Sequence, residues 1–153
     1  MTTRIARIRP RSAGAVLAVV LLAVAAAGCM AAEERTFLDR TNGLRAAHGL
    51  PGLHEQLVLN DKAEAWAQHM AATGTLEHSS LTAGLDGVAW RALAENVGVS
   101  TPTADTLATL HDRLASSPSH RANMLDGRMT HMGVGVATSG DGRVWVVEVF
   151  AAL

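Results

Sequence analysis

The sequence is poor in cysteine and in aromatic residues. Its 153 residues include one cysteine, three tryptophans, two phenylalanines and no tyrosine. A single cysteine excludes an intramolecular disulfide, and so few rings argue against a base-stacking platform for nucleic acid. A composition of 48% hydrophobic and 18% charged residues is nevertheless typical of one globular domain. Its core must consist mainly of leucine, valine, methionine and alanine.

Acidic residues are missing from the N-terminal part of the chain. Four arginines precede an uninterrupted apolar run from Ala13 to Gly28, and the first acidic residue is Glu33. This pattern is typical of an export signal. The run is somewhat short for a permanent span, which needs about 20 apolar residues, and an uncleaved anchor is the alternative. We therefore expect residues 1–28 to be a signal peptide and the mature protein to be extracytoplasmic.

The single cysteine directly follows this run. The sequence Ala26-Ala27-Gly28-Cys29 resembles the bacterial lipobox, with Ala26 where leucine is commoner. In lipobox proteins the signal is cut just before the cysteine, whose thiol receives a diacylglyceryl group. The resemblance therefore implies lipidation of Cys29, a lipid anchor in the cell membrane, and residues 29–34 as lipidated N-terminus and tether. An unmodified Cys29 in an ordinary signal tail would instead leave a secreted protein.

The mature chain is expected to be acidic. The signal holds four of the 13 basic residues and none of the 14 acidic ones, which leaves a net charge of −5 with neutral histidines. Bulk charge of this sign argues against binding to nucleic acid or to anionic lipid headgroups. No internal repeat or second domain is visible, and we expect a monomer.

Three helices are predicted from apolar residues at three-and-four spacing. They cover residues 33–48, residues from an N-cap at Asn60 or Asp61 to 73, and residues from a cap at Thr101 or Thr103 to the residue before Pro118. A short helical turn is expected at residues 90–94. Glycines 49 and 74 are the expected terminators of the first two helices.

The C-terminal part predicts a β-hairpin. Two runs rich in β-branched residues, 132–137 and 143–151, flank the turn sequence Ser139-Gly140-Asp141-Gly142. Gly133 and Gly135 fall on one face of the first strand, where another backbone can approach closely. The second strand, which contains Trp145, is expected to be central in its sheet.

Three polar segments carry the candidate functional residues. In the segment 116–125, Ser117 can cap a new helical turn that starts at Pro118 and holds His120. His78-Ser79 and Glu95-Asn96 lie in two other polar stretches. A His/Glu/His trio can bind Zn²⁺ with an open position, and the alternative is that the histidines are hydrogen-bonded to Glu95 and anchor loops over the sheet.

These segments, in this order, resemble one protein family. His78-Ser79, Glu95-Asn96-Val97-Gly98, the run from Ser117 to Leu125, and Gly133-Val134-Gly135-Val136-Ala137 closing on Val149-Phe150-Ala151 are similar to the bacterial secreted branch of the CAP superfamily, also called the SCP domain. That superfamily comprises cysteine-rich secretory proteins, antigen 5 and pathogenesis-related plant proteins. The resemblance covers residues 35–153, which we expect to be the CAP/SCP domain.

The resemblance implies an α+β fold, a three-layer α-β-α sandwich with a central antiparallel sheet. It also implies a cleft lined by two histidines and two glutamates, linked in the family to divalent metals and to lipids or sterols. His78, Glu95 and His120 match the first three of these, with Ser79 and Asn96 beside them. The second glutamate has no matching residue, since His111 and Asp112 are not at its position. Zn²⁺ or another divalent cation on His78, Glu95 and His120 is the implied cofactor.

Three functions are compatible with these residues and with the resemblance. The favoured one is a lipid-anchored binding module whose cleft takes a small ligand, a lipid or a divalent metal at the cell envelope. The second is a metal-assisted or general-base hydrolase, peptidase-like, that uses Glu95 and the two histidines. The third is an envelope interaction scaffold. The sequence contains neither His-Glu-x-x-His nor Gly-x-Ser-x-Gly, which argues against an enzyme.

Other residues near these segments are given structural roles. A serine hydrolase built on a serine close to the histidines is disfavoured, because adjacent positions often point apart. The serines concerned are Ser79, Ser117 and Ser119. The remaining histidines are expected to be surface or helix-face residues, namely His48, His54, His69, His111 and His131.

Overall fold

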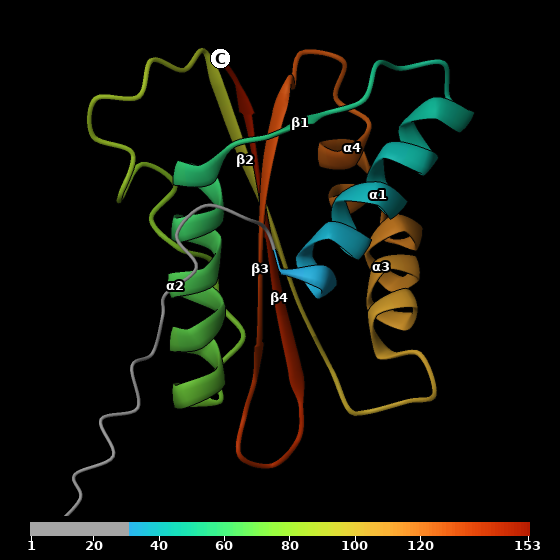
Figure 1. Cartoon of the computed structure of the whole chain (residues 1–153), viewed down its shortest axis with the longest axis vertical. Coiled ribbons are helices and arrows are strands. Elements are labelled where there is room, and N and C mark those ends of the chain that lie inside the picture. The colour runs from blue at the N-terminus through green and yellow to red at the C-terminus, as the bar shows by residue number, and fades with distance from the viewer. Residues whose placement is uncertain (1–30) are drawn as a thin grey trace, which may run out of the picture.

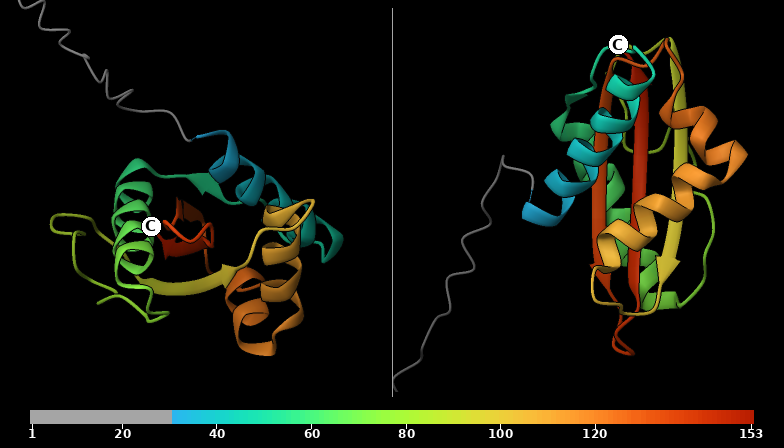
Figure 2. Two further views of the ribbon diagram at one scale, coloured as in Figure 1. Left: turned by 90° about the horizontal axis from the view of Figure 1, so that it is seen from below. Right: turned by 90° about the vertical axis from the view of Figure 1, so that its right-hand side faces the viewer.

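A computed structural model describes residues 31–153 and has three layers (Figures 1 and 2). One helix, α2, covers one face of a four-stranded sheet, and α1, α3 and α4 cover the other. The helices are α1 (Ala32–Ala47), α2 (Leu57–Thr73), α3 (Thr106–Ser116) and α4 (Pro118–Met124). The strands are β1 (His54–Glu55), β2 (Ala92–Ser100), β3 (His131–Thr138) and β4 (Val144–Ala152). The predicted α-β-α sandwich is confirmed.

The sheet is antiparallel except at one edge. Its strand order is β1-β3-β4-β2, so β4 is central as predicted. The β3–β4 hairpin and the β2–β4 pair are antiparallel, whereas the two residues of β1 pair with β3 in parallel. Eight of the nine residues of β4 are buried, because this strand has a neighbour on each side and helices over both faces.

The glycines of β3 allow α2 to lie directly against the sheet. A Cβ atom on Gly133 would lie 2.1 Å from the carbonyl carbon of Leu59, and one on Gly135 would lie 2.2 Å from that of Ala63. Real Cβ atoms do not approach backbone so closely. The predicted close approach at these two glycines is therefore confirmed, and the neighbouring element is α2.

Several predicted boundaries need correction. Residues 92–100 form strand β2, and the helical turn expected at residues 90–94 is absent. Helix α2 begins at Leu57, three residues before the expected cap. Helix α3 begins at Thr106, where the Asp105 carboxylate accepts a hydrogen bond from the Ala108 amide, so the predicted threonine caps were wrong.

A buried cation fixes α1 to the segment that carries His120. Arg45 is fully buried and donates hydrogen bonds of 2.8–3.2 Å to the carbonyl oxygens of Pro51, Met124, Asp126 and Met129. Four charge-assisted bonds compensate for the lost hydration of the guanidinium. The C-terminal end of α4 and the connection into β3 are thereby held against α1.

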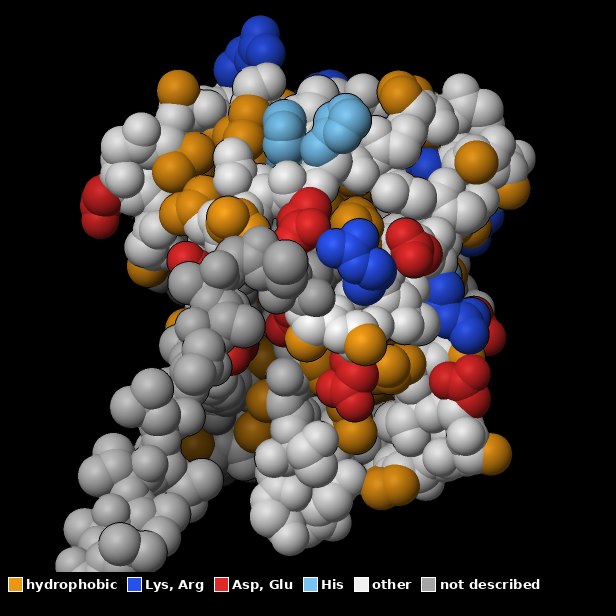
Figure 3. All heavy atoms as spheres, in the orientation of Figure 1, with side chains coloured by type: hydrophobic (Ala, Val, Ile, Leu, Met, Phe, Trp, Pro, Cys, Tyr) orange, Lys and Arg blue, Asp and Glu red, His pale blue; other side chains and the backbone are white. Residues whose placement is uncertain are grey.

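The signal peptide predicted for residues 1–28 and the predicted lipidation site Cys29 lie outside the described residues. Helix α1 begins at Ala32, so residues 32–34 of the predicted tether are helical. None of the helices in residues 31–153 has the length and hydropathy needed to cross a bilayer. Acidic and basic side chains are interspersed on the face shown in Figure 3.

Candidate functional site

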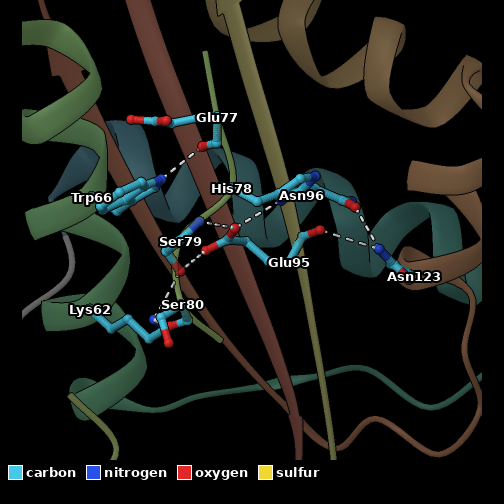
Figure 4. A network of polar contacts seen from close by, with 9 residues as sticks. All are labelled: Lys62, Trp66, Glu77, His78, Ser79, Ser80, Glu95, Asn96 and Asn123. Atoms are coloured by element: carbon cyan, nitrogen blue, oxygen red, sulfur yellow. Dashed lines mark hydrogen bonds and ion pairs between the residues drawn. The ribbon is translucent and has the colours of Figure 1, made fainter. Parts of the chain in front are cut away.

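The candidate site is built around strand β2, which is an edge strand of the sheet. Successive side chains of a strand point to opposite faces. Glu95 therefore points toward α2 and the segment 78–83, whereas Asn96 points toward α1 and α4 (Figure 4). Both residues were predicted to line one cleft, and the structure places them on opposite sides of the sheet.

The Glu95 carboxylate is held by the segment that passes over it. Its side chain is 1% exposed and accepts three hydrogen bonds. Its Oε1 atom accepts from His78 Nδ1 and from the Ser79 backbone amide, each at 2.9 Å. Its Oε2 atom accepts from the Ser79 hydroxyl. Because an ionised carboxylate only accepts, Nδ1 of His78 carries a proton, and in the neutral form of the imidazole the lone pair is then on Nε2. The His78 side chain is 61% exposed.

A buried lysine supports this arrangement from the helix side. Lys62 of α2 donates to the Ser79 hydroxyl at 3.0 Å and to the carbonyl oxygens of Ser80 and Ala83 at 2.7 and 3.1 Å. All three protons of the ammonium are thus used. Burial lowers the pKa of Lys62, and the charge of Glu95 opposes that effect. Ser79 therefore links a buried cation to a buried carboxylate.

Beside Glu95 lies a cavity of about 400 Å³, which we call the Glu95 cleft. Its polar lining comes from His78, Ser79, Glu95 and Asn123. Its apolar lining includes Leu81, which is 39% exposed, and Leu93. The cleft therefore combines hydrogen-bonding groups with an apolar wall.

His120 contributes to the other side of β2 mainly through its backbone. Asn96 donates to the His120 carbonyl oxygen at 3.1 Å, and Asn123 donates to Asn96 Oδ1 at 2.9 Å. The Nδ1 atom of the His120 ring lies 2.9 Å from the Ser117 hydroxyl. Ser117 is the N-cap residue of α4 as expected, but its side chain makes this hydrogen bond with the imidazole and none with the backbone of the helix. Burial lowers the pKa of His120, and the charge of His78 lowers it further.

Behind Asn96 lies a carboxylic acid that was not predicted from the sequence. Glu148 is fully buried and accepts hydrogen bonds from Asn96 at 2.9 Å and from the Thr41 hydroxyl at 3.0 Å. Burial raises the pKa of Glu148 from its ordinary 4.5 to about 7, although the two hydrogen bonds oppose the shift. No cation is bonded to this carboxyl group within residues 31–153.

The predicted metal ligands do not form a three-ligand group. Glu95 is occupied by His78 and Ser79, and the His120 ring is turned to Ser117. Among the described residues, no set of three or more histidine, cysteine, aspartate or glutamate side chains is arranged to hold a metal ion. As arranged here, His78, Glu95 and His120 do not fit a shared Zn²⁺ site.

Two supporting residues of the site, Lys62 and Asn123, were also not predicted. Both lie in predicted helical segments, and nothing in their spacing marks them as partners of Glu95. His111, expected to be a surface or helix-face residue, lies on the buried face of α3: it is 5% exposed, with its ring 5.8 Å from that of Phe37. Neither of its ring nitrogens has a hydrogen-bond partner in the described part of the chain.

Comparison with known proteins gives a consistent family. The model of the cysteine-rich secretory protein family, CAP, matches residues 38–150. Over 128 residues the chain is 29% identical to the uncharacterized protein YkwD of Bacillus subtilis, a match that covers 78% of this chain and 47% of YkwD. The chain thus spans less than half the length of that relative.

Solved structures with low sequence identity share the fold. An extracellular protein from Bacillus anthracis that contains an SCP domain has a TM-score of 0.63 and 23% identity, over 82% of this chain and 45% of that one. An outer surface protein from Borrelia burgdorferi has a TM-score of 0.66 and 15% identity, over 76% and 90%. Since the family match runs over nearly all of the described domain and the three-layer fold agrees with these structures, the chain belongs to the cysteine-rich secretory protein (CAP) family.

Proposed function

We propose that this protein is an exported, lipid-anchored binding protein that holds a small amphipathic molecule in the Glu95 cleft at the cell envelope. The observation that carries the proposal is the mixed lining of the cleft. His78 and Glu95 form a polar end, and Leu81 and Leu93 form an apolar wall around about 400 Å³. Ligand pockets commonly have this size and combine apolar walls with a few polar groups.

The polar end of the cleft favours a ligand that donates hydrogen bonds. His78 donates its Nδ1–H to Glu95, so in the neutral form of the ring its Nε2 is an acceptor. The Glu95 carboxylate would repel an anionic headgroup placed beside it. A neutral headgroup with hydroxyl donors, attached to an apolar chain that packs on Leu81 and Leu93, suits these groups.

Binding is favoured over hydrolysis because the nearest serine is already engaged. The Ser79 hydroxyl donates a hydrogen bond to Glu95 and accepts one from Lys62. Turning this hydroxyl toward a substrate would break its bond to Lys62 and leave the buried ammonium without one of its three partners. We therefore expect no turnover of esters or peptides in the Glu95 cleft.

The envelope location in this proposal rests on the sequence of residues 1–29. The arginine-rich start, the apolar run and the Ala26-Ala27-Gly28-Cys29 ending support export followed by lipidation. The extracellular description of the Bacillus anthracis protein, which shares the fold, agrees with export. Since α1 begins at Ala32, a lipid on Cys29 would keep the domain within about 10 Å of the membrane surface.

The binding proposal can be tested with 1-monolauroylglycerol as the probe, kept below its micelle concentration. Calorimetry should show saturable binding to the wild-type protein, and laurate should bind more weakly because of its charge. Leu81→Asp should weaken binding of monolauroylglycerol at least tenfold, since a buried leucine contributes about 1.5–3 kcal/mol. The matched control is Leu57→Asp, at a leucine that is 48% exposed and does not line the cleft.

Two results would contradict the proposal. One is the absence of saturable binding of monolauroylglycerol to the wild type. The other is an equal loss of affinity in Leu81→Asp and Leu57→Asp, which would place the contact outside the Glu95 cleft. Thermal unfolding of both variants checks that each remains folded.

A further inference from the structure

A second group of potential ligands lies away from the Glu95 cleft, where β1 meets β3. His54 and His131 are directly paired residues in the parallel register of these strands. Paired residues on neighbouring strands project to the same face, so the two imidazoles lie side by side. Their ring centres are 5.7 Å apart and the ring planes are tilted by 47°. Figure 3 shows two adjacent histidine side chains near the end of the sheet where β1 lies.

The separation of the two rings suits a shared ion. Imidazole nitrogens bind Zn²⁺ at about 2.0–2.1 Å, and two imidazoles on one tetrahedral ion have ring centres about 5 Å apart. The observed 5.7 Å is close to that value. Side-chain rotation alone can make up the difference, because His54 is exposed and His131 is half-buried.

A threonine fixes the His131 ring in the tautomer that a metal requires. Thr130 Oγ1 lies 2.8 Å from His131 Nδ1 and 3.3 Å from the Ala151 carbonyl oxygen, and it accepts a hydrogen bond from the Leu153 amide at 3.1 Å. A hydroxyl has one proton and two lone pairs. All three contacts are satisfied together when Thr130 donates to Ala151 and accepts from His131 Nδ1. The lone pair of His131 then lies on Nε2, where an ion can bind.

This arrangement has the form that surrounds metal-bound histidines in proteins. Such histidines usually donate their second ring N–H to an oxygen, which fixes the ring and raises its basicity as a ligand. Thr130 supplies that oxygen for His131. Within residues 31–153 no hydrogen bond engages the His54 ring, so its nitrogens are available as well.

We propose that His54 and His131 together bind one divalent transition-metal ion, Zn²⁺ or Cu²⁺, with Thr130 as the positioning residue for His131. Ions of this class prefer imidazole ligands, and Cu²⁺ binds such ligands more tightly than Zn²⁺. Two protein ligands leave the remaining positions of the ion to water or to an external ligand. The site shares no residue with the Glu95 cleft and does not depend on the function proposed for it.

The test is calorimetric titration of Zn²⁺ and Cu²⁺ at pH 7.5 into the wild type and four variants. The wild type should bind one equivalent, with two nitrogen ligands visible in the electron paramagnetic resonance spectrum of bound Cu²⁺. His54→Ala and His131→Ala should each weaken binding at least tenfold, and Thr130→Val about tenfold. The matched control is His69→Ala, which removes an exposed histidine of α2 and should leave the affinity for both ions unchanged.

Three outcomes would overturn the site. They are a wild type that takes up neither ion, binding that survives both His54→Ala and His131→Ala, and a loss of binding in His69→Ala equal to theirs. His54 is exposed and His131 is only half-buried, so the alanine variants should stay folded, and their thermal midpoints are measured in the absence of metal. In a variant that keeps its midpoint, a lost signal is assigned to the missing ligand and not to unfolding.

Discussion

Replacement of the buried acid Glu148 by glutamine should remove a pH dependence of stability. Glu148 has a pKa of about 7 in the folded protein against an ordinary 4.5. Between these values the folded protein keeps a proton that the unfolded chain has released. The contribution of Glu148 to the free energy of unfolding is therefore fully present below pH 4.5, and it is lost as the pH rises through 7. At 1.36 kcal/mol per pKa unit, the total loss is on the order of 3 kcal/mol.

Glutamine retains the hydrogen-bonding pattern without the titration. Its carbonyl oxygen can accept from Asn96, and its amide can donate to the Thr41 hydroxyl, at the positions of the two carboxyl oxygens. Glu148→Gln should therefore be close to the wild type at pH 5 and more stable than it at pH 8. The gain at pH 8 should approach 3 kcal/mol in order of magnitude.

Urea unfolding at pH 5, 6, 7 and 8 measures this difference. Subtracting the two proteins at each pH cancels the other titrating groups, and Glu64→Gln, an exposed change on α2, serves as the control that should keep the wild-type dependence. A difference between wild type and Glu148→Gln that is constant from pH 5 to 8 would refute the reasoning. It would mean that Glu148 is ionised in the folded protein throughout this range.

Three further predictions concern the fold, the cleft and the anchor. Gly135→Ala should destabilise the protein by about 3 kcal/mol or more in denaturant unfolding, because the new methyl would meet the α2 backbone at 2.2 Å. The control Gly43→Ala, whose new methyl has no atom within 4 Å, should instead stabilise the protein by up to about 1 kcal/mol. An unchanged stability of Gly135→Ala would show that α2 is free to move away from the sheet. Lys62→Met should speed amide exchange in the segment 79–83, and unchanged protection there would mean that the ammonium does not hold it. Cys29→Ser should abolish fatty-acid labelling and detergent partitioning, whereas persistent labelling would remove the lipid anchor.

The sequence predicted best those elements whose signals are local. The hairpin of β3 and β4 follows from β-branched residues around a turn that contains two glycines, and the glycines of β3 correctly indicated a close backbone contact. Strand β2 was missed because its small and polar residues show no alternation. Its extended form is imposed by nine residue pairs with β4, which are contacts distant in sequence.

The contrast between local signals and contacts distant in sequence also explains which residues of the candidate site were predicted. His78, Ser79 and Glu95 were predicted as neighbours, and hydrogen bonds join them in the structure. Glu148 was hidden within a strand of β-branched residues, and its partners lie 52 and 107 residues away. Which side of the sheet Asn96 faces depends on the register of β2, and the sequence did not reveal that strand.

The guanidinium of Arg45 sets an order for the folding of the chain. It reaches the carbonyl oxygens of Met124, Asp126 and Met129 across 79, 81 and 84 residues, and contacts over such separations close late because of their loop entropy. Until they form, docking α1 would bury a cation without its hydrogen bonds. We therefore expect α1 to dock only together with the connection between α4 and β3. In a chain that emerges N-terminus first, α1 would then stay undocked until the chain has been made as far as Met129.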